Sequence, residues 1–182
     1  MPKQVLFIQG GGKAVHNDWD DKLVTSLIRA LGPDYDVRYP VMPHEDDPHF
    51  NAWKMAILAG IDKLDDGAVL VGHSIGAAVL ISAITDAAKR KFGGIFLLSP
   101  PFIGDGGWPS DEIPPMVGLG QLLPQDTPVY LYHGFSDDIV PPAHADLYQQ
   151  AIPGVFVHRL ARRNHQLDDD LTEVAADILA LT

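Results

Sequence analysis

Short runs of apolar residues alternate along the chain with longer segments in which apolar residues recur every three or four positions. Each run is about four residues long, rich in β-branched or aromatic residues, and bounded by glycine, proline or polar residues. A run that is apolar at every position is typical of a parallel strand covered on both faces. We therefore predict buried strands at Val5–Ile8, Ala68–Val71, Ile95–Leu98, Val129–Tyr132 and Val155–Val157.

One further segment has a different pattern. From Tyr35 to Val41, apolar residues alternate with polar ones, and Pro40 lies within the segment. This alternation predicts a half-exposed strand at the edge of a sheet, where a proline is tolerated.

Segments with helical periodicity separate the strands. The spacing of apolar residues predicts helices over residues 23–31, 53–64, 75–88 and 167–178. The alternation of strands and helices predicts an α/β fold of three layers, with a parallel sheet between helices on both faces. Because no repeat or linker divides the chain, we predict a single domain over residues 1–182.

Residues 99–128 interrupt this rhythm. The stretch contains seven of the 15 prolines and five of the 17 glycines, and no helical period persists in it. Irregular connections of this length are usually functional or mobile. We therefore expect either an excursion over the upper edge of the sheet or a poorly ordered connection.

Composition excludes several classes of function. The 13 Lys and Arg and 24 Asp and Glu residues give a net charge of −11, so neither nucleic acid nor an anionic membrane is an expected partner. The absence of cysteine excludes disulfides, thiol nucleophiles and cysteine-bound metals. No apolar run is long enough to span a bilayer or to form the core of a signal peptide, which predicts a cytoplasmic protein.

The candidate chemistry begins at Gly72-His73-Ser74-Ile75-Gly76, which matches the pattern G-x-S-x-G. The motif follows a predicted strand and opens a predicted helix. A sharp strand-to-helix turn raises the serine hydroxyl above the sheet, and the flanking glycines let other backbone segments approach. Ser74 is therefore the candidate nucleophile, and a serine that caps the helix is the alternative interpretation.

A serine nucleophile requires a histidine base, which a carboxylate orients. In this architecture the acid and then the histidine follow the serine along the chain. Asp137 is the candidate acid, with Asp138 as the alternative. His144 follows too closely and His158 lies in or just beyond a strand, whereas His165 lies in the loop after the last strand. We therefore predict that His165 is the base.

Acyl transfer through a tetrahedral intermediate also needs two backbone N–H donors for the oxyanion. Ile75, the residue after the nucleophile, is one candidate, and Gly11 in the glycine run after the first strand is the other. The run matches neither a P-loop nor a dinucleotide fingerprint, because Phe7 and Val15 occupy positions where those motifs need small residues.

Two other features are less specific. The histidines and acidic residues of His44–His49 are irregularly spaced, so we interpret them as a solvated loop before a helix and predict no metal or other cofactor. Phe102, Trp108 and Phe135 lie in predicted loops and are candidate walls of a substrate pocket.

These motifs resemble those of the α/β-hydrolase family of serine hydrolases. The matching segments are VLFIQGGG, VGHSIG, HGFSDDIVPP and the late His165, and they extend from residue 5 to residue 165. The stretch Met42–Trp53 is similar to that of compact serine hydrolases related to retinoblastoma-binding protein 9. The resemblance implies a minimal fold without a cap domain and a six-stranded parallel sheet in the order 2-1-3-4-5-6. In such a fold, the excursion of residues 99–128 is expected over the active-site edge.

The resemblance also implies a function. Ser74, His165 and Asp137 would hydrolyse a small acyl ester or thioester through an acyl-enzyme. Transfer of the acyl group to an acceptor other than water would use the same residues. A protein-interaction module with a vestigial triad is a further alternative, against which the intact set of residues weighs.

Overall fold

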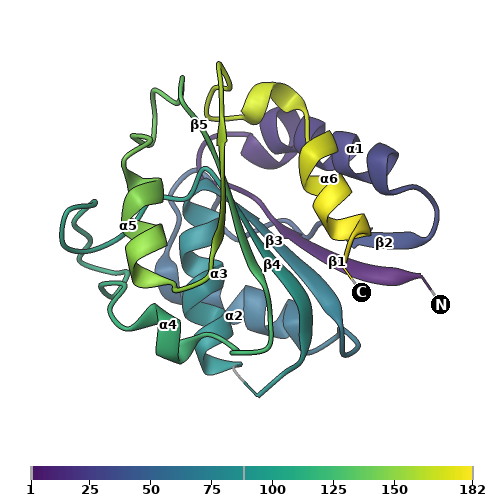
Figure 1. Cartoon of the computed structure of the whole chain (residues 1–182), viewed down its shortest axis with the longest axis horizontal. Helices are drawn as coiled ribbons and strands as arrows, with labels where there is room; N and C mark the ends of the chain where they lie inside the picture. Colours follow the sequence, from purple (N-terminus) through teal and green to yellow (C-terminus); the bar gives the residue numbers. More distant parts are fainter. Residues whose placement is uncertain (1, 88, 182) are drawn as a thin grey trace.

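The computed structural model describes residues 2–87 and 89–181 and contains a parallel sheet of six strands (Figure 1). The strand order is β2-β1-β3-β4-β5-β6, which confirms the predicted order. The strands are β1 (Lys3–Ile8), β2 (Tyr35–Arg38), β3 (Ala68–His73), β4 (Phe92–Leu98), β5 (Val129–Gly134) and β6 (Phe156–Leu160).

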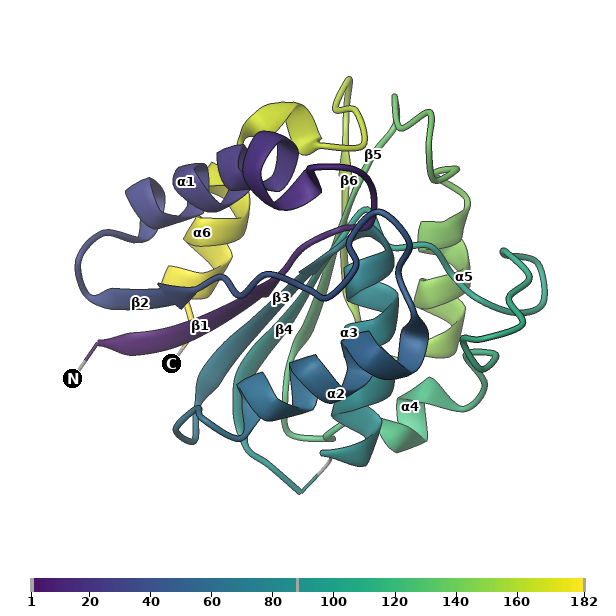
Figure 2. The same ribbon diagram turned by 180° about the vertical axis from the view of Figure 1, so that it is seen from behind.

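Helices cover both faces of the sheet, as predicted (Figures 1 and 2). One face carries α1 (Asp20–Leu31), which a π-helical turn, η1 (Val15–Trp19), precedes, and α6 (Thr172–Leu179), which a 3₁₀ turn, η2 (Leu167–Asp169), precedes. The other face carries α2 (Phe50–Ile61), α3 (Ser74–Asp86), α4 (Leu119–Leu122) and α5 (His144–Ala151).

The central strands β3 and β4 are mostly apolar because successive side chains enter different helix layers. In β1, Val5 and Phe7 belong to the core cluster that includes α1 and α6. Leu6 and Ile8 belong to the opposite cluster, which includes α2 and α3. The edge strand β2 pairs only with β1 in the described sheet and is partly exposed, as its alternating pattern predicts.

Some element boundaries differ from the predicted ones. The edge strand β2 ends at Arg38, before Pro40. The buried strand predicted at Val155–Val157 is wrong in its burial, because β6 (Phe156–Leu160) forms the other edge of the sheet and its side chains are partly or fully exposed. Ala88, the last residue of the predicted helix over residues 75–88, lies outside the described residues.

The predicted helix over residues 167–178 is wrong as a single element. Asp168 and Asp169 adopt left-handed φ angles of 54° and 57°, which an α-helix cannot continue through. The Asp170 carboxylate accepts a hydrogen bond from the Thr172 N–H (3.0 Å) two residues further on, an Asx turn, and α6 begins at Thr172 as a separate helix.

The irregular stretch over residues 99–128 packs against the helices of one face. The Ile103 carbonyl accepts a hydrogen bond from the Met116 N–H (2.8 Å), and the Phe102 carbonyl accepts one from the Trp108 N–H (2.9 Å). Several of its apolar side chains are buried in the core, namely those of Phe102, Ile103, Ile113, Met116, Leu119 and Leu123.

The strand order brings the loops after β1 and β3 next to each other at one edge of the sheet. The chain leaves β1 toward β2 and returns to pair β3 on the opposite side of β1, with Ile8 in register with Gly72. The loops after these two strands therefore lie side by side at the carboxyl edge of the sheet, where ligands bind in sheets of this kind. Within residues 2–87 and 89–181, no helix combines the length and the apolar character needed to cross a membrane.

Candidate active site

Ser74 lies in a strained turn between β3 and α3. Its φ angle of 51° is left-handed, which is uncommon for a residue with a side chain. The turn is tight because glycines flank it: a Cβ atom on Gly72 would lie 2.7 Å from the Ala77 Cα, and one on Gly76 would overlap the carbonyl oxygen of Gln9. The backbone therefore matches the strained strand-to-helix turn that the motif predicts.

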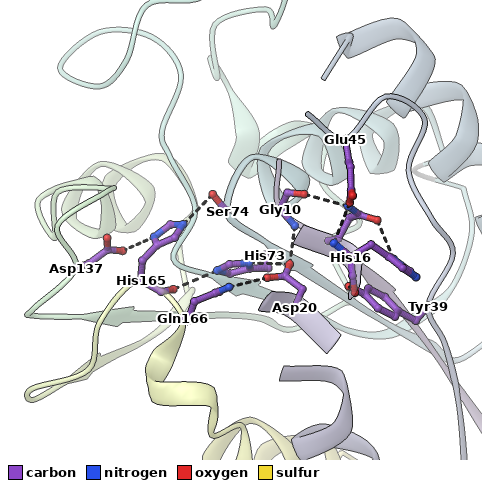
Figure 3. Close-up of polar contacts among 11 residues, drawn as sticks. Gly10, His16, Asp20, Tyr39, Glu45, His73, Ser74, Asp137, His165 and Gln166 are labelled. Carbon is purple, nitrogen blue, oxygen red and sulfur yellow. Dashed lines mark hydrogen bonds and ion pairs between the residues drawn. The ribbon is translucent and has the colours of Figure 1, made fainter. Parts of the chain in front are cut away.

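The structure brings Ser74, His165 and Asp137 together, although 91 residues separate the serine from the histidine (Figure 3). The Nε2 atom of His165 lies 3.0 Å from the Ser74 Oγ atom, and its Nδ1 atom lies 2.9 Å from Asp137 Oδ2. With Nδ1 carrying the proton, the imidazole donates to the carboxylate, and its free Nε2 accepts from the hydroxyl. The arrangement can remove a proton from the serine hydroxyl.

Asp137 is fixed as a carboxylate. Its Oδ1 atom accepts hydrogen bonds from the N–H groups of Ile139 (2.9 Å) and Val140 (2.8 Å), and His133 Nε2 lies 3.2 Å from Oδ2. Burial raises the pKa of Asp137, but the hydrogen bonds from His133 and His165 outweigh it and hold the pKa well below its ordinary value. Asp138, the alternative acid, is exposed to solvent.

The other two histidines that follow Asp137 have different partners. His144 is buried at the start of α5, where its Nδ1 atom accepts the Phe102 N–H (2.8 Å). His158 lies in β6, with its Nε2 atom 3.2 Å from Asp177 Oδ2. His165 is thus the histidine that reaches the serine.

The glycine run after β1 faces the serine. The Gly10 N–H donates to Asp20 (2.7 Å), and the Gly12 N–H donates to the Glu45 carbonyl (2.6 Å). Among the described residues, the N–H groups of Gly11 and Ile75 have no such partner. Those two N–H groups are the ones that the sequence singles out as oxyanion donors.

A polar cluster supports this loop from the other side (Figure 3). Glu45 accepts hydrogen bonds from the Gln9 side chain (2.6 Å) and from the His16 N–H (2.8 Å), while Gln9 Oε1 lies 2.9 Å from His16 Nδ1. The His16 ring stacks on Tyr39 with the ring centroids 4.0 Å apart. The cluster holds the backbone that leads into the glycine run.

Sequence reasoning missed Asp20, which is fully buried and lies behind the site. A signal for it exists, because Asp20 stands three and four residues before Leu23 and Val24 and so falls on the apolar face of α1. A charged residue on such a face needs a buried partner. That partner, His73, lies inside the serine motif itself, with Nδ1 2.9 Å from Asp20 Oδ2.

The three candidate pocket aromatics differ in their exposure and in the side chains that their rings contact. Phe102 is buried with its ring edge-on to Tyr148, and Trp108 is partly buried with its ring edge-on to His144. Phe135 is 59% exposed in the turn before Asp137. Their contact with a substrate stays a prediction.

A cavity of about 410 Å³ lies beside Ile75. A Cβ atom on Gly11 would lie 2.7 Å from Pro48 and 2.9 Å from Ile75, so the candidate oxyanion loop adjoins two residues of the cavity wall. The lining is mainly apolar with acidic residues at one side: Pro48, Phe50, Trp53, Ile75, Val79, Ser110, Asp111, Glu112 and Ile113.

The histidines and acidic residues of the loop His44–His49, all within the described residues, do not form a metal site. His49 lies 3.7 Å from both Asp47 and Glu112, and α2 begins at the next residue. In the part of the chain that the structure describes, no group of three or more histidine or acidic side chains is arranged to hold a metal ion.

Comparison with known proteins identifies the family and the fold of this chain. The model of the family described as "Serine hydrolase" matches residues 8–158. A comparison with curated proteins finds no sequence match. Solved structures show the fold. The esterase domain of a Rhodothermus marinus protein has a TM-score of 0.70 at 19% identity, with 99% of this chain and 86% of that chain covered.

Two other solved structures are similarly close. The ydeN gene product from B. subtilis has a TM-score of 0.70 at 19% identity, over 98% of this chain and 99% of that one. A Xanthomonas campestris serine hydrolase described as lacking a lid has a TM-score of 0.64 at 19% identity, over 98% of this chain and 80% of that chain. The minimal α/β-hydrolase fold that the motifs predict is thereby confirmed.

Proposed function

The chain belongs to the serine hydrolase family, and we propose that it hydrolyses small carboxylic esters or thioesters through an acyl-enzyme on Ser74. The observation that carries this proposal is the unbroken chain of hydrogen bonds from Ser74 through His165 to Asp137. Such a chain activates a hydroxyl that is otherwise a weak nucleophile.

The first half of the proposed reaction forms the acyl-enzyme. Ser74 Oγ bonds to the carbonyl carbon while its proton passes to His165 Nε2, and the carbonyl oxygen becomes an oxyanion. The N–H groups of Gly11 and Ile75 donate to that oxyanion, a contribution of about 3 kcal/mol for each donor in comparable sites. The carbon–oxygen or carbon–sulfur bond then breaks, and the leaving group takes the proton from His165.

The second half releases the acid. A water molecule gives a proton to His165 Nε2 as its oxygen bonds to the acyl carbon, and a second tetrahedral intermediate forms. Its collapse breaks the bond to Ser74 Oγ, which recovers its proton from His165. Asp137 keeps its charge throughout and stabilises the imidazolium that forms twice in each cycle.

The cavity beside Ile75 fits the acyl group. The leaving group must lie next to His165 Nε2, because it takes its proton from there. The cavity is lined by Pro48, α2, α3 and residues 110–113. His165 and Asp137 do not line it. The acyl group therefore extends into this apolar cavity, where the exposed carboxylates of Asp111 and Glu112 disfavour acyl groups that carry a negative charge.

A fluorophosphonate probe tests the proposed function. We expect the native protein to react stoichiometrically and peptide mass spectrometry to place the adduct on Ser74, because the probe reacts with activated serines. The labelled protein should lose hydrolysis of p-nitrophenyl butyrate in proportion to labelling.

Heat-denatured protein and the variant Ser82→Ala, altered elsewhere on α3, are the controls. Denatured protein should stay unlabelled, and Ser82→Ala should react like the native protein. If native Ser74 stays unlabelled and no ester is turned over, the proposed hydrolase function is wrong, and the interaction module becomes the better hypothesis. A product formed on an added alcohol instead of water would identify an acyltransferase.

A substitution in the cavity tests where the acyl group binds. Val79→Phe adds a ring to the cavity wall, so we expect kcat/KM for a hexanoyl ester to fall about tenfold, equivalent to ~1.4 kcal/mol, and that for an acetyl ester to change less than about twofold. The ratio of kcat/KM for p-nitrophenyl hexanoate and acetate measures the effect.

Val117→Phe is the matched control, because Val117 is 76% exposed and does not line this cavity. It should leave the ratio unchanged. Equal losses for both esters in Val79→Phe would show instead that the substitution disturbs the catalytic groups.

A further inference from the structure

One buried carboxylate contacts three separate segments of the site. Asp20, the first residue of α1, is fully buried. It accepts hydrogen bonds from the Gly10 N–H (2.7 Å), from His73 Nδ1 (2.9 Å) and from Gln166 Nε2 (3.0 Å), as Figure 3 shows. Three donors around one carboxyl group favour its ionised form, and the pKa of Asp20 lies below its ordinary value although burial raises it.

Each donor is the immediate chain neighbour of a residue in the proposed reaction. Gly10 precedes the oxyanion donor Gly11, His73 precedes the nucleophile Ser74, and Gln166 follows the base His165. The three segments come from the β1 loop, the β3–α3 turn and the loop after β6, and they meet at this carboxylate.

The contacts of His73 determine its charge. Its Nδ1 atom faces the Asp20 carboxylate at 2.9 Å, and its Nε2 atom faces the carbonyl oxygen of His165 at 3.1 Å. Both partners are acceptors, which favours a proton on each ring nitrogen and therefore the imidazolium form of His73. The side chain of His73 is only 2% exposed, so Asp20 is the buried counter-charge that makes the cation tenable.

We propose that Asp20 is a positioning residue that holds the oxyanion loop, the nucleophile turn and the base loop in register, and that it does so with His73 as a permanent imidazolium. This inference rests on the proposed hydrolase function. Asp20 and His73 lie behind the reacting groups, so they act on the reaction through Gly11, Ser74 and His165.

The imidazolium also affects the base. The rings of His73 and His165 are 5.0 Å apart, and the charged groups that face them are Asp20 from α1 and Asp137 from the β5–α5 loop. Burial lowers the pKa of His165, the hydrogen bond to Asp137 raises it, and the positive charge of His73 lowers it further, so the pKa lies below its ordinary value. Burial lowers the pKa of His73 itself, but the Asp20 carboxylate outweighs burial and raises it.

Loss of the His73 charge should move the acid limb of kcat/KM to higher pH. The reaction needs neutral His165, so kcat/KM falls on the acid side where His165 becomes protonated. A variant without the His73 charge loses a contribution that lowers the pKa of His165. Its acid limb therefore moves to higher pH.

Asp20→Asn is the test variant, and Asp21→Asn, an exposed neighbour with the same change of charge, is its matched control. For Asp20→Asn we expect kcat to fall roughly 100-fold with little change in KM, because small displacements of the three segments misplace the reacting groups. The acid limb of kcat/KM should rise only slightly, because this variant loses both the His73 charge, which lowers the pKa of His165, and the Asp20 charge, which raises it. Asp21→Asn should match the native protein in both measurements.

His73→Asn is the second variant, because its amide can still donate to Asp20 but carries no charge. Because Asp20 keeps its charge in this variant, the acid limb should shift further upward than in Asp20→Asn, by about one pH unit, with a smaller loss of kcat. If Asp20→Asn folds and matches Asp21→Asn in kcat and in its acid limb while the native protein hydrolyses esters, the inference is wrong and the proposed function stands.

NMR of the native protein provides a measurement that needs neither activity nor a variant fold. With ¹⁵N-labelled histidine, both ring nitrogens of His73 should show the shifts of an imidazolium at pH 8, where exposed histidines are neutral. Backbone-to-ring correlations in the native protein, labelled with ¹³C and ¹⁵N, assign the signals to His73. A neutral tautomer at pH 8 would overturn the inference even if every variant failed to fold, whereas a failure of fluorophosphonate labelling would concern the proposed function alone.

Discussion

Ser74→Ala and His165→Ala are each expected to reduce kcat for p-nitrophenyl butyrate at least about 10⁴-fold, and the double variant is expected to lose no more than the worse single one. The two side chains act as one unit, since the proton that leaves Ser74 Oγ crosses the 3.0 Å hydrogen bond to His165 Nε2. Without either partner, only the oxyanion donors and substrate binding remain. Steady-state kinetics of the single and double variants, with active-site titration, measures the loss.

Asp137→Asn extends the same test to the acid. The amide presents a donor as well as an acceptor to His165 Nδ1, so the imidazole no longer has to hold its proton there, and a loss of about 10⁴-fold in kcat is expected. His158→Ala, a histidine whose partner is Asp177, is the control and should keep native kcat. If the losses of Ser74→Ala and His165→Ala multiplied in the double variant, the two side chains would not act in one shared proton transfer.

The central strands could be predicted from the sequence because burial on both faces leaves an unbroken apolar run, whereas the short apolar run at Val155–Val157 belongs to an edge strand that is not buried. The other edge strand, β2, was evident, since its solvent-facing positions are polar. The break before α6 was not evident, because it depends on the left-handed backbone of Asp168 and Asp169 rather than on hydrophobic spacing. Periodicity reports which face is buried, and it does not report where a single residue leaves the helical conformation.

The reacting groups could be proposed from the sequence because their chemistry fixes a local turn and an order along the chain. The neighbours that hold them depend on contacts over long chain separations. Asp20 accepts a hydrogen bond from Gln166, which is 146 residues away along the chain, and Glu45 accepts one from Gln9, which is 36 residues away. The cavity is a similar case, because Ser110 and Ile113 line it from a segment that no motif marks.

Gly76→Ala is expected to cost about 2 kcal/mol or more in the free energy of unfolding and to remove most of the activity. In an unconstrained helix the change would gain up to about 1 kcal/mol from helix propensity. Here the added Cβ would overlap the carbonyl oxygen of Gln9, which is backbone and cannot rotate away. Urea unfolding followed by circular dichroism measures the free energy, and the expected fall in Tm is roughly 4–8 °C.

Gly60→Ala is the matched control, because it is also a helical glycine beside β1. Its Cβ would lie 3.3 Å from the end of the flexible Leu6 side chain, which can move, so its free energy of unfolding should stay within about 1 kcal/mol of the native value. The contrast separates helix propensity from the contact between α3 and the loop after β1. Since Gln9 leads directly into Gly10 and Gly11, a displaced carbonyl at Gln9 moves the oxyanion loop away from Ser74. Native stability and native activity in Gly76→Ala would mean that the loop does not depend on this contact.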